Sequence, residues 1–191
     1  MPMKCRFTRE EVQKAALDCV REGGAAALTA RALAARLGCS VKPIFGLFTN
    51  MEEVQRETMC AAKQLYRRRT AEEIASGSYP AYKATGMAYI RFAMEEPELF
   101  KWLYMRDRTG EQPEAEEIGD MVAMIRRNTG LSEEQARLFH LEMWVCVHGI
   151  AAMIATGFLS WDMELSGRLV TDCYFGLKSR FIGEEKANGS H

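Results

Sequence analysis

The apolar residues of this 191-residue chain recur with the period of an α-helix in segment after segment, and no segment alternates convincingly like a β-strand. The first such segment follows Thr8 and Glu11, which have the spacing of a capping box, and it ends at Gly23 and Gly24. One stripe carries its apolar residues, namely Val12, Ala15, Ala16, Cys19 and Val20. The pattern predicts an all-α protein.

Two shorter helices are predicted directly after this segment. Thr29 is a suitable N-cap for the first, and Gly38 stands where a left-handed residue commonly ends a helix. Ser40 can cap the second, predicted over Val41–Leu47, and Pro43 falls in its first turn, where a missing N–H is tolerated. We expect this second helix to bury a stripe made of Val41, Ile44, Phe45 and Phe48.

Caps, loop residues and apolar periodicity predict six further helices. The first of them has Asn50 as its cap, with Glu53 three residues later, and runs to about Ala75. The other five are expected at about 81–94, 98–105, 114–128, 132–158 and 162–181. The chain should therefore have about nine helices, and residues 186–191 should form a disordered tail.

The helix expected at 132–158 is apolar nearly all round, so it needs burial on more than one side. Gly149, Ala152 and Gly157 would let another helix approach it closely. Together with the helix at 162–181, it can form a four-helix interface across a two-fold axis. We therefore predict a homodimer built through helices about 133–158 and 162–181.

The first third of the chain has short helices followed by a long one, which is the layout of a helix-turn-helix DNA-binding domain. From about Val12 to Val54 the chain resembles the DNA-binding domain of the tetracycline-repressor (TetR) family of transcriptional regulators. The landmarks are Ala15-Ala16-Leu17, Gly24, Thr29, Arg31, Leu33-Ala34, Gly38, Ser40, Ile44-Phe45, Phe48 and Glu52-Glu53. The resemblance implies a three-helix DNA-binding domain over residues 1–54, a connecting helix over 51–75, and an effector-binding and dimerisation domain over 55–185.

The same resemblance implies which residues meet DNA. Lys42 is the candidate for a hydrogen bond to a base or a phosphate, and Thr29 and Arg31 would contact phosphates or base edges from the preceding helix. Ser40 could donate to a phosphate. Apolar contacts to thymine methyl groups are expected from Val41 and Pro43.

The chain departs from the family pattern at the end of the predicted recognition helix. Phe45, Gly46 and Leu47 occupy positions where the family usually has Tyr, Tyr and His, whose polar groups commonly touch phosphates or bases. All three positions remain candidates for DNA contact. Binding should therefore depend mainly on Lys42, Arg31 and backbone N–H groups.

A second resemblance covers the C-terminal part, which is similar to a group of ligand-binding domains of TetR-type regulators with a Trp-His-Gly signature. The residues that carry it are Ala88-Tyr89-Ile90-Arg91-Phe92-Ala93, Glu96-Pro97, Leu99-Phe100, Trp144 and His148-Gly149. It implies a small-molecule effector. The candidate effector-binding residues are Phe92, Trp102, Met105, Met121, Met124, Met143, Trp144 and His148, and ordinary core packing is the alternative for each.

The distribution of charge supports DNA binding by the N-terminal third of the chain. Residues 1–69 hold thirteen Lys and Arg against seven Asp and Glu, whereas residues 70–191 hold twelve against nineteen, so a chain of net charge −1 has a basic first third and an acidic remainder. Charged faces are also common on ordinary solvated helices. Because the basic part coincides with the helix-turn-helix, the coincidence favours double-stranded DNA as a partner.

Other functions find little support in the sequence. We expect no enzyme, no cofactor and no metal site, because no glycine-rich phosphate loop, nucleophile elbow or paired ligand motif is present. The six cysteines are scattered, which suggests reduced thiols in a cytoplasmic protein, and no signal peptide or membrane span is expected. We therefore predict a repressor released from a palindromic operator by a small molecule. The alternative is a helical scaffold or adaptor whose helix-turn-helix no longer reads DNA specifically.

Overall fold

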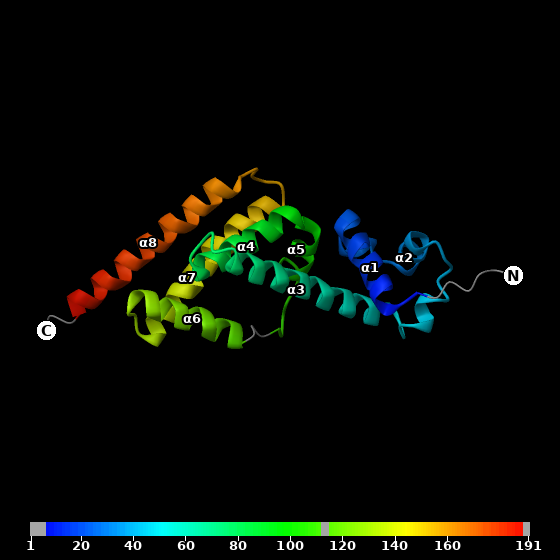
Figure 1. The fold of residues 1–191 in the computed structure, drawn as a ribbon, viewed down its shortest axis with the longest axis horizontal. Coiled ribbons are helices and arrows are strands. Elements are labelled where there is room, and N and C mark those ends of the chain that lie inside the picture. The colour runs from blue at the N-terminus through cyan, green and yellow to red at the C-terminus, as the bar shows by residue number, and fades with distance from the viewer. Residues whose placement is uncertain (1–6, 112–114, 189–191) are drawn as a thin grey trace. The chain divides into compact units, whose positions relative to one another are not determined.

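The computed structural model describes residues 7–111 and 115–188 and confirms the all-α fold, since these residues contain no strand (Figure 1). Eight α-helices and two short 3₁₀ helices make up the described chain. They are α1 (Arg9–Gly23), η1 (Ala25–Ala27), α2 (Ala30–Leu37), η2 (Ile44–Gly46), α3 (Met51–Ala75), α4 (Ala81–Glu95), α5 (Pro97–Tyr104), α6 (Ala115–Thr129), α7 (Glu133–Ala155) and α8 (Met163–Asn188).

The predicted helix caps are confirmed except that of Ser40, since the short helix that follows it has no side-chain cap. The Thr8 hydroxyl accepts a hydrogen bond from the Glu11 N–H, and the Glu11 carboxylate accepts one from the Thr8 N–H at 2.8 Å. Asn50 Oδ1 accepts from the N–H of Glu53 at 2.8 Å. Gly38 ends α2 with φ 66° and ψ 31°, in the left-handed region that glycine adopts without strain. These local signals fix where the short helices begin and end.

The predicted recognition helix at 41–47 is wrong in its form. Residues 41–43 make a turn, and Ile44–Gly46 add a single 3₁₀ turn without a side-chain cap. The N–H of Gly46 is shared between the carbonyls of Lys42 and Pro43, at 3.1 and 3.2 Å. Pro43 offers no N–H and glycine is a poor helix former, so this segment does not build regular α-helical turns.

The expected buried stripe is only partly present, since Val41 is partly exposed and Phe45 is exposed. Ile44 and Phe48 are buried as predicted, whereas the side chain of Phe45 is 42% exposed. Consecutive residues of a 3₁₀ helix are about 120° apart, so burying Ile44 turns Phe45 outward. The segment therefore presents an aromatic ring to solvent in place of packing it.

The last helix is longer than predicted. α8 runs past Phe181 to Asn188, so residues 186–188 of the expected tail are helical and residues 189–191 lie outside the described part of the chain. Asp162 caps its start, since Asp162 Oδ1 accepts from the N–H of Leu165 at 2.7 Å.

One described helix, α7, has the length and apolar composition of a membrane span, and about a third of its most apolar stretch is buried within the chain. It packs against α6 and α8, and its Val147 lies against Gly86 of α4.

The chain forms two compact units. The first comprises Met1–Arg68 and Glu95–Arg106, and the second comprises Arg69–Met94 and Asp107–His191. Helix α5 therefore packs with α1 in the first unit, although α4 and α6, its neighbours in sequence, belong to the second. Sequence order does not suggest this association.

Candidate functional site

The nine predicted DNA-contacting residues lie within the first unit, on α2, on the turn after it and on η2. The side chains of Thr29, Arg31, Ser40 and Lys42 are exposed, as is Gly46. Val41, Pro43 and Leu47 are partly exposed. The Thr29 hydroxyl accepts from the N–H of Ala32 at 3.2 Å, which leaves its O–H free to donate.

Arg31 and Lys42 form no ion pair within residues 7–111 and 115–188, in contrast to the other arginine of α2 and to the arginines of α1. Arg36, on the same helix as Arg31, is bound to Glu22 and lies 3.9 Å from Asp18. Arg9 and Arg21 are also paired with carboxylates. The exposed guanidinium group of Arg31 and the exposed ammonium group of Lys42 therefore remain available to bind an external anion.

Arg9 fixes the position of residues 41–47, which we term the recognition turn, and no pattern in the sequence indicates this role. Its Nε and Nη2 atoms donate to the carbonyl oxygen of Leu47 at 3.1 and 2.8 Å. The same guanidinium donates to Glu53 at 2.5 Å and to Glu57 at 2.6 Å, and it lies 4.6 Å from the centre of the Phe48 ring. The start of α1, the end of the turn and the start of α3 are thus joined through one side chain.

Glu53 also helps to join these three segments. Its carboxylate accepts from the N–H of Thr49 at 2.6 Å as well as from Arg9. The hydrogen bond from the Thr49 backbone, followed by that from Arg9, lowers the pKa of Glu53 to about 2. The carboxylate is therefore ionised at neutral pH, and it holds both the cap of α3 and the arginine that fixes the turn.

A second ion pair joins α1 to α5. Arg21 donates through Nε and Nη2 to the two carboxylate oxygens of Glu96, at 2.8 and 2.9 Å, and through Nη1 to Asp18. Glu96 is buried, with 7% of its surface exposed.

A Cβ added at Gly24, where φ is 72°, would lie 2.9 Å from the carboxylate of Glu98. The sequence between α1 and α2 therefore needs glycine both for its backbone and for the close approach of α5.

The predicted effector residues are distributed over both units. Trp102 and Met105 belong to the first unit, and the others belong to the second. In the second, the Tyr89 hydroxyl and His148 Nδ1 are 2.9 Å apart, and the Trp144 ring stacks on His148 with an interplanar angle of 24°. Burial, with a smaller effect of Arg108, lowers the pKa of His148. Phe92 and Met143 are buried, and Met121 accepts from the Thr85 hydroxyl at 3.7 Å. Their role in effector binding stays a prediction.

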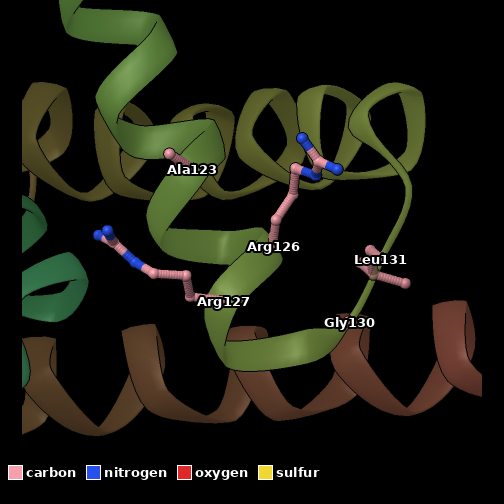
Figure 2. Close-up of a pocket in the computed structure, with 5 residues that line it drawn as sticks. All are labelled: Ala123, Arg126, Arg127, Gly130 and Leu131. Carbon is pink, nitrogen blue, oxygen red and sulfur yellow. The ribbon is translucent and has the colours of Figure 1, made fainter.

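Two hollows lie elsewhere. One, of about 420 Å³, lies at the end of α6 and is lined by Ala123, Arg126, Arg127, Gly130 and Leu131. Figure 2 shows that the two arginine side chains leave α6 in different directions and do not converge on one point. The other, of about 380 Å³, lies between α1 and α2 and is lined by Cys19, Glu22, Gly23, Ala27, Ala32 and Arg36. None of the eight predicted effector residues lines either hollow. In the part of the chain that the structure describes, no three His, Cys, Asp or Glu side chains are grouped to hold a metal ion.

Apolar side chains are left exposed on α7. Leu138, Leu141, Trp144 and Val145 recur at helical spacing and form what we term the α7 apolar face. Val145 is 60% exposed. On α8, Leu165 and Phe175 are exposed as well. Because isolated exposed apolar residues are common but a contiguous row is not, this face is a candidate contact surface.

Comparisons with known proteins support the TetR resemblance that the sequence predicts. Residues 82–173 match a family described as the tetracyclin repressor-like C-terminal domain. The fold is similar to the solved structure of a TetR family member from Streptomyces coelicolor A3, with a TM-score of 0.59 and 15% sequence identity over 87% of this chain and 98% of that one. No curated protein matches the chain. The predicted TetR resemblance is thus confirmed, whereas the narrower Trp-His-Gly group stays a prediction.

Proposed function

We propose that this chain is a TetR-type transcription regulator, a cytoplasmic repressor that binds a palindromic operator as a homodimer and leaves it when a small molecule binds the second unit. The observation that carries the proposal is the charge arrangement around the recognition turn. Arg9, Arg21 and Arg36 are neutralised by carboxylates, while Arg31 and Lys42 are exposed and unpaired within the described chain. Unpaired cations at the start of α2 and on the turn after it can meet the phosphates on either side of a DNA groove.

The start of α2 adds a second source of attraction for phosphate. The first N–H groups of a helix point outward and carry partial positive charge, so an anion is stabilised there. Arg31 lies in this first turn, next to the exposed Thr29 hydroxyl. The Phe45 ring and the Gly46 backbone are the exposed groups of η2, so we expect η2 to approach DNA through apolar and backbone contacts.

Selection of the preferred DNA sequence from genomic fragments, followed by affinity measurements at several salt concentrations, tests DNA binding. A regulator prefers one site over bulk DNA and loses affinity steeply as salt rises. We expect Arg31→Ala and Lys42→Ala each to weaken binding about tenfold and to reduce the salt slope by about one. Arg36→Ala is the matched control, because it removes an equal charge that Glu22 already neutralises, and it should leave the slope unchanged.

The alternative, a scaffold or adaptor without specific DNA binding, makes the opposite prediction. Such a protein binds all fragments alike, and Arg31→Ala and Arg36→Ala then have the same small effect. If a site is preferred, a reporter gene placed behind it distinguishes repression from activation, since co-expression of the protein lowers the signal only in the first case.

The homodimer is proposed to form through the α7 apolar face and the exposed residues of α8. A second copy would bury these side chains, and a two-fold axis would present two recognition turns to the two halves of a palindrome. Val145→Glu places a charge in this face and should convert the dimer to a monomer in light scattering after gel filtration. Ile74→Glu is the control, because Ile74 is also exposed in the second unit but lies on α3. A dimer that survives Val145→Glu would overturn this interface.

Release by a small molecule is proposed for the second unit, where the predicted effector residues Phe92, Met121, Met124, Met143, Trp144 and His148 are found. An effector can release DNA only if it binds the non-binding conformation more tightly. Native mass spectrometry of the purified protein tests for a retained ligand. Added ligand should then lower operator affinity in the wild type and have less effect in His148→Ala.

A further inference from the structure

The last two helices each carry one cysteine, and these two cysteines meet. Cys146 lies on α7 and Cys173 on α8, and both side chains are partly buried. Cys173 lies close enough to Cys146 to contribute to the raised pKa of the Cys146 thiol. We infer that Cys146 and Cys173 form a dithiol site, which hydrogen peroxide or a related peroxide oxidises to a disulfide within one chain.

The register of the α7–α8 hairpin brings the two residues to the same level. Cys146 lies nine residues before Ala155, where α7 ends, and Cys173 lies ten residues after Met163, where α8 begins. α7 and α8 pack against each other (Figure 1). In two helices joined by a short connection, residues equally far from the connection are opposite each other.

Contacts further along the hairpin hold this register independently of the cysteines. Arg180 donates to Glu142 at 2.6 Å, and the rings of Phe139 and Tyr174 are 5.3 Å apart. The Phe139 ring also lies 5.8 Å from that of Phe181. The packing of the two helices therefore places Cys146 and Cys173 at the same level of the hairpin. A disulfide needs Cα atoms about 4.4–6.8 Å apart, which side chains as small as cysteine allow between packed helices.

The two thiols have different roles in the reaction. Burial, followed by the interaction with Cys173, raises the pKa of Cys146 to about 12, so Cys146 stays a thiol at neutral pH. The first nucleophile is therefore Cys173. Its thiolate attacks one oxygen of hydrogen peroxide, a sulfur–oxygen bond forms and the oxygen–oxygen bond breaks. The departing hydroxide takes up the proton that Cys173 released and becomes water.

The second step closes the disulfide. The sulfur of Cys146 attacks the sulfenic sulfur of Cys173, the sulfur–oxygen bond breaks, and the hydroxyl group leaves with the proton of Cys146 as a second water. Two thiols are oxidised to one disulfide and one peroxide is reduced to two waters. The product joins α7 to α8 of the same chain.

Peptide mapping of the full chain tests this inference. The reduced protein is treated with hydrogen peroxide, remaining thiols are blocked with N-ethylmaleimide, and tryptic peptides are analysed without reduction. Cleavage after Arg137, Arg168 and Lys178 places Cys146 and Cys173 in different peptides. We expect these two peptides to be linked, with one disulfide per chain and two hydrogens lost from the intact mass. The oxidised protein should remain a single-chain band on a non-reducing gel.

Single variants test the order of the steps. In Cys146→Ser, Cys173 should stop at the sulfenic acid and be labelled by dimedone. In Cys173→Ser, Cys146 should remain an unlabelled thiol. Cys60→Ser is the control, since Cys60 is exposed on α3, and it should leave the linked peptides unchanged. The inference is overturned if Cys60 is oxidised while Cys146 and Cys173 stay free, if either is linked to another cysteine, or if the chains become joined to each other.

Discussion

The two units of this protein are stabilised by different chemistry. In the first unit, short elements are joined by the ion pairs of Arg9 with Glu53 and Glu57, and of Arg21 with Glu96. In the second, long helices meet mainly through rings and buried apolar side chains, as in the contact of Phe139 with Tyr174. An ion pair such as that of Arg180 with Glu142 lies at their exposed margin. η2 and α2 are too short to persist alone in water, so directional contacts to neighbouring elements must position them. The long helices have more apolar surface than one chain covers, which leaves the α7 apolar face exposed.

This difference separates structural charges from functional ones in the first unit. A net basic segment is often interpreted as a uniform DNA-binding surface. Here, however, several of its arginines are occupied by carboxylates, and they determine where the turn and α5 lie. Only cations outside those pairs, such as Arg31 and Lys42, can be expected to change DNA affinity through their own charge.

The largest effect is expected from removing the ion pair between α1 and α5. Arg21→Ala leaves the buried Glu96 carboxylate without its bidentate partner, which should lower the free energy of unfolding by about 2 kcal/mol, a value reduced because Arg21 is partly exposed. The midpoint of thermal unfolding should fall by about 4–8 °C. Arg137→Ala is the control in the second unit, since its pair with Glu133 is on the surface, and it should change the midpoint little. Equal losses in both variants would contradict the comparison.

A smaller effect, on DNA affinity more than on stability, is expected from Arg9→Ala. The recognition turn loses the two hydrogen bonds to the Leu47 carbonyl, so its position should become less defined and operator binding several-fold weaker. Gln13→Ala is a matched control on the same helix, because Gln13 donates to the same Glu57 at 2.8 Å but forms no hydrogen bond with Leu47 among the described residues. If both variants bind the operator equally, the Leu47 bonds do not position the turn.

The two units should also lose stability in different acid ranges. The pKa of Glu53 is lowered to about 2, so its contribution is complete above its ordinary value of 4.5 and is lost as the pH falls toward 2. Burial lowers the pKa values of His140 and His148, so their neutral forms stabilise the second unit above the ordinary value of 6.5, and protonation below it is destabilising.

Scanning calorimetry between pH 7.5 and 3 can separate these ranges. We expect Glu53→Gln to flatten the change in unfolding temperature below about pH 4.5, and His148→Gln to flatten part of the change just below about pH 6.5. The explanation fails if both variants flatten the same range.

The smallest effect on the free protein is expected from Gly46→Ala. A Cβ atom built at Gly46 meets no other atom within 4 Å, so unfolding should be nearly unchanged. Operator affinity should nevertheless fall, because we expect the DNA backbone to approach η2 closely at this position. Circular dichroism and binding measurements on the same sample check both statements, and unchanged affinity would show that DNA stays away from Gly46.

Much of the fold could be predicted because local signals specify it. Thr8, Thr29, Gly38 and Asn50 each act through neighbours within a few residues, and the structure confirms their caps. The form of η2 could not be predicted, since a stripe of apolar residues does not distinguish an α-helix from a 3₁₀ turn followed by a coil. The candidate site was only partly predictable. Arg31 and Lys42 stand out in the sequence, but whether a cation is free depends on partners such as Glu96, which is 75 residues from Arg21.

The anchoring of the recognition turn through a main-chain carbonyl has a consequence for how such a protein can diverge. Arg9 holds Leu47 by its backbone oxygen, which every amino acid supplies. Substitutions along the turn can therefore alter the groups offered to a base pair while the anchor remains intact. Positions 41–47 should tolerate variation in an evolving or engineered binding specificity far better than Arg9 does, although Arg9 itself touches no base in this scheme.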